Sequence, residues 1–177
     1  MFPAQEEQLQ RILIFGNAGT GKSWLARQIG VLIDRPVIHL DDRRWVPGQY
    51  GAARNNRLVF NEVVEAAQAE AWLMEGVYSW LAEGVLGRAT TLIWIDLPED
   101  ECVANVTARG IQGGGSEENF KELIEWIKEY RLRENSSTSY SGHQKLFNEY
   151  VGSKTLLANR AEIGAFVESI RAMTAYD

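Results

Sequence analysis

The stretch Gly16-Asn17-Ala18-Gly19-Thr20-Gly21-Lys22-Ser23 decides the fold of this chain, because it fits the pattern Gly-x-x-x-x-Gly-Lys-Ser/Thr. It follows the apolar run Ile12-Leu13-Ile14-Phe15 and precedes a helical pattern that begins near Lys22. A strand, a glycine-rich loop and a helix in this order make the Walker A motif, which binds nucleotide phosphates. A glycine-rich turn that ends in Lys-Ser by chance is the alternative, and the flanking strand and helix argue against it.

The glycines and the lysine explain why this spacing suits a phosphate. Successive backbone N–H groups curl into a concave loop where no Cβ intrudes, as at Gly16, Gly19 and Gly21. The next helix turns the positive end of its dipole toward the same phosphates. We expect Lys22 to reach the β- and γ-phosphates and the Ser23 hydroxyl to ligate Mg²⁺. The predicted nucleotide-binding residues here are Gly16, Asn17, Ala18, Gly19, Thr20, Gly21, Lys22, Ser23 and Trp24.

Length and composition predict one globular domain over residues 1–177. Hydrophobic residues make up 45% of the chain and charged residues 24%, which is ordinary for a soluble protein. The lone Cys102 excludes an internal disulfide and favours a buried, reduced thiol.

Charge and hydropathy restrict the partners. The formal net charge of −6 argues against broad nucleic-acid binding, which needs a basic surface. Residues 1–10 lack the basic and apolar regions of a signal peptide, and no segment approaches the length of a membrane span. We therefore expect a cytoplasmic protein without a membrane partner, as a monomer or a homodimer.

Apolar runs alternate with helical patterns along the chain, which predicts an α/β three-layer sandwich with a parallel sheet. The loop through Pro47-Gly48 and the stretch 135–139 are expected to be irregular, and Gly113 to Gly115 to be the hinge of a mobile flap. His39 is expected to be packed within a strand, and His143 to lie in a polar loop. The predicted strands are 12–15, 37–40, 72–74, 91–95 and 154–157.

Acidic residues follow three of these strands, and ligands bind outside the carboxyl ends of parallel strands. Asp41 is predicted to orient or deprotonate an accepting hydroxyl, or to be an outer-sphere partner of Mg²⁺. The alternative is a solvated loop acid paired with Arg43 or Arg44. Glu75 is predicted to hold metal-bound water, with a structural turn as the alternative, while Gly76 would let a substrate approach. Asp96 is predicted to organise Mg²⁺ or to cap the helix after it.

Arg109, Arg131 and Arg133 flank the glycine-rich flap. Their planar guanidinium groups match the oxygens of a transferring phosphoryl group, which makes them candidate catalytic residues beside Lys22 and Asp41. A solvated helix face is the alternative for Arg131 and Arg133. Four aromatic residues near the predicted cleft could stack on a base or sugar, or else pack in the core or at the rim: Trp45, Tyr50, Tyr78 and Trp80.

Taken together, these motifs resemble the adenylate-kinase-like branch of the P-loop kinases, and more narrowly the DNA topology modulation proteins. The likeness covers nearly the whole chain. It rests on Gly16 to Ser23, Leu40-Asp41 with Trp45 and Pro47-Gly48, Glu75-Gly76-Val77-Tyr78, Leu92 to Pro98, Phe120 to Tyr130 and Thr155 to Val167.

The resemblance implies a P-loop NTPase fold with a five-stranded parallel sheet, and a lid over about 109–140. It implies ATP, or GTP, as donor with Mg²⁺. By position, Arg109, Arg131 and Arg133 resemble lid arginines, and Asn159-Arg160 lies in the region that contacts the donor base in these relatives. Adenylate kinases proper continue from Asp-Gly into Phe-Pro-Arg, and this chain has no arginine there.

The sequence therefore predicts ATP-dependent phosphoryl transfer to a small acceptor such as a nucleoside, a nucleotide or another hydroxyl compound. Ser23 with Glu75 and Asp96 would organise Mg²⁺. A regulatory nucleotide-binding protein without kinase activity is one alternative, and a DNA-associated P-loop protein is another.

Overall fold

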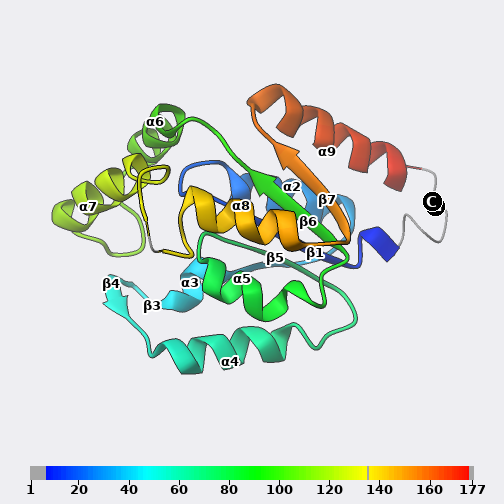
Figure 1. The fold of residues 1–177 in the computed structure, drawn as a ribbon, viewed down its shortest axis with the longest axis horizontal. Helices are drawn as coiled ribbons and strands as arrows, with labels where there is room; N and C mark the ends of the chain where they lie inside the picture. The colour runs from blue at the N-terminus through cyan, green and yellow to red at the C-terminus, as the bar shows by residue number, and fades with distance from the viewer. Residues whose placement is uncertain (1–6, 135, 176–177) are drawn as a thin grey trace.

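The computed structural model describes residues 7–134 and 136–175, and its centre is a parallel sheet of five strands in the order β2-β5-β1-β6-β7 (Figure 1). The strands are β1 (Arg11–Gly16), β2 (Val37–His39), β5 (Trp72–Gly76), β6 (Thr91–Ile95) and β7 (Ser153–Leu157). The α/β fold and the five-stranded parallel sheet expected from the sequence are confirmed.

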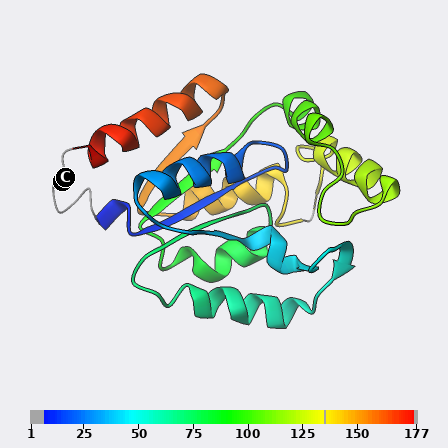
Figure 2. The same ribbon diagram turned by 180° about the vertical axis from the view of Figure 1, so that it is seen from behind.

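Helices cover both faces of the sheet, because a parallel strand is apolar on both sides. Leu13 and Phe15 of β1 pack toward α4, α5 and α8, whereas Ile12 and Ile14 pack toward α2, α6, α7 and α9. Figures 1 and 2 show these two layers from opposite sides. The helices are α2 (Lys22–Leu32), α3 (Leu40–Arg44), α4 (Asn56–Ala66), α5 (Ser79–Leu86), α6 (Glu99–Arg109), α7 (Glu117–Lys128), α8 (Tyr140–Glu149) and α9 (Arg160–Thr174).

Side chains cap the N-termini of two helices whose first residues follow a serine or an asparagine. The Ser116 hydroxyl accepts from the Asn119 amide at the start of α7, and the Asn159 side chain accepts from the Glu162 amide at the start of α9. None of the helices among the described residues combines the length and the apolar character that crossing a bilayer requires.

The loop through Pro47-Gly48 was expected to be irregular, and the structure corrects this. It is an antiparallel hairpin of β3 (Trp45–Val46) and β4 (Gln49–Ala53), in which Val46 pairs with Gln49 across a Pro-Gly turn. Gly48 has a φ of 73°, as the second central residue of such a turn requires. Strand β3 has only two residues, and β4 consists largely of glycine and alanine, so the sequence shows no alternation of apolar and polar residues here.

Helix α8 was also missed, and His143 lies in it rather than in a polar loop. The helix begins after Ser139, whose hydroxyl accepts from the Gly142 amide. A Cβ on Gly142 would lie 2.0 Å from the Ser137 carbonyl oxygen, so only glycine fits there. The inward face of this helix includes a glycine and a buried histidine, so the sequence lacks the regular spacing of apolar residues that predicts a helix.

Gly16→Ala is expected to destabilise the protein by about 2–4 kcal/mol. A Cβ on Gly16 would lie 2.2 Å from the Ile95 carbonyl oxygen, at a φ of 148°. Gly87→Ala makes the same change at a φ of −63° in open space, and it should alter stability by less than about 1 kcal/mol. Urea unfolding of both variants measures the difference. Equal stabilities would contradict the close approach of β1 and β6 at this point.

Candidate active site

The glycine-rich loop leaves β1 and enters α2 with a backbone that glycine alone permits. Gly16, Gly19 and Gly21 have φ values of 148°, 82° and 92°. A Cβ on Gly19 would lie 2.3 Å from the Cys102 carbonyl oxygen, so the loop packs directly on the backbone of α6. Gly21 precedes α2 without a side-chain cap, which leaves the first N–H groups of that helix available to an anion.

Buried side chains hold this loop in shape. The Asn17 amide donates to the Ile127 carbonyl at 3.1 Å, and the Thr20 hydroxyl donates to the Asn17 carbonyl at 3.0 Å. The Lys22 ammonium also donates to that carbonyl, at 2.9 Å. Since an ammonium has three donors, Lys22 keeps others for a phosphate.

Glu75 lies at the carboxyl end of β5 and is only 2% exposed. Its Oε1 accepts from the Ser23 hydroxyl at 2.9 Å and lies 2.5 Å from His39 Nδ1. Burial raises the pKa of Glu75, but the His39 and Ser23 hydrogen bonds and the Lys22 charge outweigh it and lower that pKa overall. The pKa of His39 is raised by its hydrogen bond to Glu75. Glu75 therefore stays ionised.

The Ser23–Glu75 pair fits Mg²⁺. The second carboxylate oxygen of Glu75, Oε2, is buried without a hydrogen-bond partner. Mg²⁺ is bound by one or two protein oxygens together with water and substrate phosphates, and an unpaired carboxylate oxygen beside a hydroxyl suits that role. Within residues 7–134 and 136–175, no group of three or more His, Cys, Asp and Glu residues forms a cage for a metal.

Asp41 lies in the first turn of α3, where its carboxylate accepts from the Val77 amide at 2.8 Å. The sequence predicts that Gly76 lets a substrate approach, and the structure corrects this. A Cβ on Gly76 would lie 2.9 Å from Asp41 Oδ1, so Gly76 makes room for the Asp41 carboxylate instead. Burial raises the pKa of Asp41 to about 6, with the Lys22 charge opposing the shift and the Glu75 charge adding to it.

Asp41 is not a solvated acid paired with a neighbouring arginine, which was the alternative. Arg43 lies 3.9 Å from Glu62, and Arg44 donates to the Arg54 carbonyl at 2.9 Å. Asp41 is therefore free of a guanidinium partner among these neighbours.

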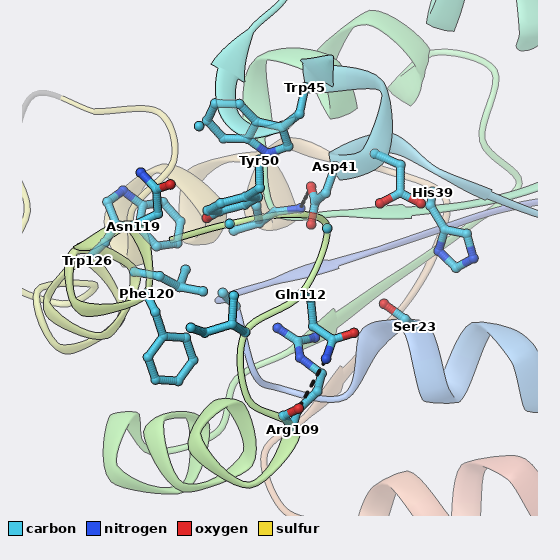
Figure 3. A pocket seen from close by; sticks show the side chains of 18 of the residues that line it. Ser23, His39, Asp41, Trp45, Tyr50, Arg109, Gln112, Asn119, Phe120 and Trp126 are labelled. Atoms are coloured by element: carbon cyan, nitrogen blue, oxygen red, sulfur yellow. Dashed lines mark hydrogen bonds between the residues drawn. The ribbon is translucent and has the colours of Figure 1, made fainter. Parts of the chain in front are cut away.

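The strand ends open into a pocket of about 750 Å³ (Figure 3). It lies between the glycine-rich loop, the β3–β4 hairpin and the segment from Arg109 to Trp126. Three of the four aromatic candidates line it, namely Trp45, Tyr50 and Tyr78. Its other lining residues include Ala18, Ser23, Arg27, His39, Asp41, Asp42, Gly51, Glu75, Val77, Arg109, Gln112, Asn119, Phe120, Glu122, Leu123 and Trp126.

Of the three lid arginines, Arg109 lines this pocket, and the other two have protein partners elsewhere. Arg131 donates to both carboxylate oxygens of Asp96, at 2.7 and 2.9 Å, and to Glu99 at 2.6 Å. Arg133 donates to the Trp126 carbonyl, and its guanidinium lies 4.0 Å from the Trp126 ring centroid. The structure does not bring these two arginines to the pocket lining.

Asp96 binds Arg131 in this structure and is not part of the pocket lining. The alternative of a helix cap is wrong, because Pro98 occupies the N-cap of α6 and no side chain caps this helix. A role for Asp96 toward Mg²⁺ stays a prediction.

Of the remaining residues predicted to bind the nucleotide, Arg160 is connected to the glycine-rich loop through Asn105. Arg160 donates to the Asn105 side chain at 2.6 Å, and Asn105 donates to the Gly19 carbonyl at 2.7 Å. Asn159 caps α9, and Trp24 is 47% exposed on α2. Their contacts with a nucleotide stay predictions.

The sequence does not predict that His143 is buried, and the structure places it in contact with Val77 at the wall of the pocket. Burial lowers the pKa of His143 to about 3, which keeps its ring neutral. Its Nδ1 lies 2.5 Å from the Tyr130 hydroxyl, and its Nε2 lies 3.0 Å from the Val77 carbonyl oxygen. Because a carbonyl only accepts, Nε2 carries the proton and Nδ1 accepts from Tyr130. Val77 is thus held by His143 on one side and Asp41 on the other.

Comparisons with known proteins place the fold. No family model and no curated protein matches the sequence. Among solved structures, a gluconokinase from Sinorhizobium meliloti 1021 is 15% identical with a TM-score of 0.59, over 96% of this chain and 93% of that one. A shikimate kinase from Bacteroides thetaiotaomicron is 16% identical with a TM-score of 0.56, over 94% and 98%.

A third solved structure is a shikimate kinase from Acinetobacter baumannii in complex with shikimate. It is 12% identical with a TM-score of 0.57, over 98% of each chain. These similarities show that the chain has the α/β fold of P-loop kinases.

Asp41→Asn is expected to stabilise the fold by about 1–3 kcal/mol at pH 8 and to have little effect near pH 3.5. The folded-state pKa of Asp41, about 6, lies above its usual value of 3.8. The stability that protonated Asp41 contributes is present below its usual pKa and is lost as the pH rises through about 6. Urea unfolding across this pH range measures the effect. The adjacent, exposed Asp42→Asn is the control, and the same pH dependence there would contradict the assignment.

Proposed function

We propose that this chain is a kinase that transfers the γ-phosphoryl group of ATP to a hydroxyl group of a small acceptor. One observation carries the proposal. The Asp41 carboxylate, held by the Val77 amide, lies in the wall of the same pocket as Ser23 and Glu75. A volume of about 750 Å³ beyond a phosphate-binding loop leaves room for a second small molecule. The P-loop kinase fold supports the same reading.

The donor side of the site is built from the loop and from β5. The glycine-rich loop and Lys22 would bind the β- and γ-phosphates. Ser23 and Glu75 would hold Mg²⁺, which supplies positive charge against the phosphate oxygens when bound. Arg109, which lines the pocket, would meet the charge that spreads over the transferring group. GTP is the alternative donor.

Asp41 is the proton acceptor in this proposal. The acceptor's hydroxyl oxygen bonds to phosphorus as the bond from that phosphorus to its bridging oxygen breaks, and the electron pair of the broken bond stays on ADP. The hydroxyl proton passes to the Asp41 carboxylate and from there to water. Because its pKa is about 6, Asp41 is ionised at neutral pH and yet more basic than an ordinary aspartate.

Arg131 and Arg133 would act through the lid. Arg131 joins the segment after α7 to Asp96 and Glu99, and Arg133 joins it to Trp126. A direct part in the transfer would require either arginine to leave these partners.

Lys22→Met is expected to lower acceptor-dependent ADP formation at least about 100-fold, because it removes the cation that meets the phosphate charge. The measurement is ADP release with ATP and Mg²⁺ over a panel of nucleosides, sugars and small alcohols. Lys145→Met is the control, since that lysine is 74% exposed on α8, and it should keep the wild-type rate. Equal rates in the wild type and Lys22→Met, or turnover that no acceptor changes, would favour a regulatory nucleotide-binding protein.

Asp41→Asn is expected to lower kcat by about 10²–10⁴-fold while ATP binding is retained. In the wild type, kcat/KM should fall about tenfold per pH unit below about 6, because a protonated Asp41 accepts no proton. A pH series of initial rates measures this profile, and isothermal titration with ATP measures binding. A rate independent of pH from about 5 to 8 would rule out Asp41 as the base.

A further inference from the structure

One part of the pocket is lined by aromatic and acidic side chains, and we call it the acceptor half. Figure 3 shows Trp45, Tyr50, Phe120 and Trp126 on one side of the pocket, and Ser23 and His39 on the other. We define the acceptor half as the pocket-lining residues that come from α3, the hairpin, the two residues after β5, and α7: Asp41, Asp42, Trp45, Tyr50, Gly51, Val77, Tyr78, Asn119, Phe120, Glu122, Leu123 and Trp126.

Aromatic rings reach the acceptor half from two separate parts of the chain. The hairpin supplies Trp45 and Tyr50, whose ring centroids are 4.9 Å apart. Helix α7 supplies Phe120 and Trp126, and Tyr78 follows β5. Rings of this kind offer flat faces and hydroxyl or indole N–H groups at the edge, which suits a ligand ring that also carries hydroxyls.

The two aromatic walls are joined to each other. The Tyr50 amide donates to the Gly113 carbonyl at 3.0 Å, which links the hairpin to the glycine-rich flap. A Cβ on Gly114 would lie 2.1 Å from the Gly48 carbonyl oxygen, so flap and turn are in direct backbone contact. The acceptor half is therefore a formed binding surface in this structure.

The charged side chains of the acceptor half are all acidic. Asp41, Asp42 and Glu122 contribute carboxylates, and none of the described residues that line the acceptor half is a lysine or an arginine. Of the two arginines that line the whole pocket, Arg109 is near enough to Tyr50 for its charge to oppose the rise in the pKa of that tyrosine, and the proposed function assigns Arg109 to the transferring phosphoryl group. Arg27 is one helical turn after Ser23 on α2, and Figure 3 shows Arg109 beside Gln112, across the pocket from Asp41.

The arginines nearest the hairpin have partners outside the pocket. The Arg44 guanidinium lies 5.2 Å from the Trp45 ring centroid and donates to the Arg54 carbonyl. Arg54 makes two hydrogen bonds to Glu62, at 2.5 and 3.1 Å, and Arg43 lies 3.9 Å from the same carboxylate. None of these guanidinium groups lines the pocket.

An anionic acceptor would meet three carboxylates here, and the nearby cation, Arg109, is assigned to the transferring phosphoryl group. Such an acceptor would therefore lose its hydration without gaining a cation of its own. A neutral ring would stack on the aromatic side chains, and an amino group would be attracted by both the rings and the acids. We infer that the acceptor is a ring-bearing alcohol, neutral or amino-substituted, that carries no carboxylate or phosphate. This inference rests on the proposed kinase function and narrows it.

The test uses compounds that share a skeleton and differ in charge. One set is uridine and adenosine with their 5′-monophosphates, and the other is glucose, glucosamine and glucuronate, all of which form a pyranose ring. Binding to the wild type is measured by tryptophan fluorescence and by titration calorimetry with Mg²⁺ and a nonhydrolysable ATP analogue present. The neutral or amino member of a set should bind at least about tenfold more tightly than its anionic counterpart. The first set represents nucleosides, and the second represents amino sugars.

A pair of variants on α7 tests the role of charge. Glu122→Lys places a cation in the acceptor half, and it should tighten binding of the anionic members at least about threefold relative to the neutral ones. Glu118→Lys makes the same change one turn earlier at an exposed position outside the pocket lining, and it should leave this ratio unchanged. Equal shifts in both variants would show that overall charge, and not the acceptor half, sets the preference.

The binding readout separates the two proposals. Tighter binding of the neutral members, together with no phosphoryl transfer to them by the wild type with ATP and Mg²⁺, would support the ligand class and overturn the kinase. Tighter binding of a phosphate or carboxylate member to the unaltered acceptor half would overturn the ligand class, whatever the turnover. Failure of every neutral and amino member to bind at about 10 mM would overturn it as well.

Discussion

The site depends on the close approach of the glycine-rich loop to backbone on either side of it. Gly16 lies against the Ile95 carbonyl of β6, and Gly19 lies against the Cys102 carbonyl of α6, at distances that exclude a Cβ. These contacts fix where the loop leaves the sheet and where α2 begins. The position of Lys22 and Ser23 follows, and with it the hydrogen bond from Ser23 to Glu75.

Two carboxylates at the same edge of the sheet, the buried Glu75 and the partly buried Asp41, have opposite pKa shifts. Glu75 receives hydrogen bonds from Ser23 and His39, and its pKa is lowered even though burial alone would raise it. Asp41 has a single donor, the Val77 amide, and burial raises its pKa to about 6. The number of hydrogen-bond donors thus sets the pKa of each carboxylate. Glu75 has a low pKa, which suits a metal ligand, and Asp41 has a raised pKa, which suits a proton acceptor.

Hydrogen bonds to Val77 and Tyr50 fix the position of the acceptor half. Val77 lies between Asp41 and the neutral His143, and His143 accepts from Tyr130 at the end of α7. On the opposite side, Tyr50 of the hairpin bonds to Gly113 of the flap. The hairpin, the flap and α8 are far apart in the sequence, and all three support one site because the parallel sheet brings its carboxyl ends together.

The sequence by itself determined the strand, loop and helix around Gly16 to Ser23, the α/β class, and the caps at Ser116 and Asn159. Each depends on residues close together in the chain. Tertiary structure alone decided the Pro47-Gly48 hairpin, the burial of His143, and the pairing of Arg131 with Asp96, which lie 35 residues apart. Such contacts depend on which surfaces the sheet brings together, and local patterns of hydrophobicity and charge do not record that.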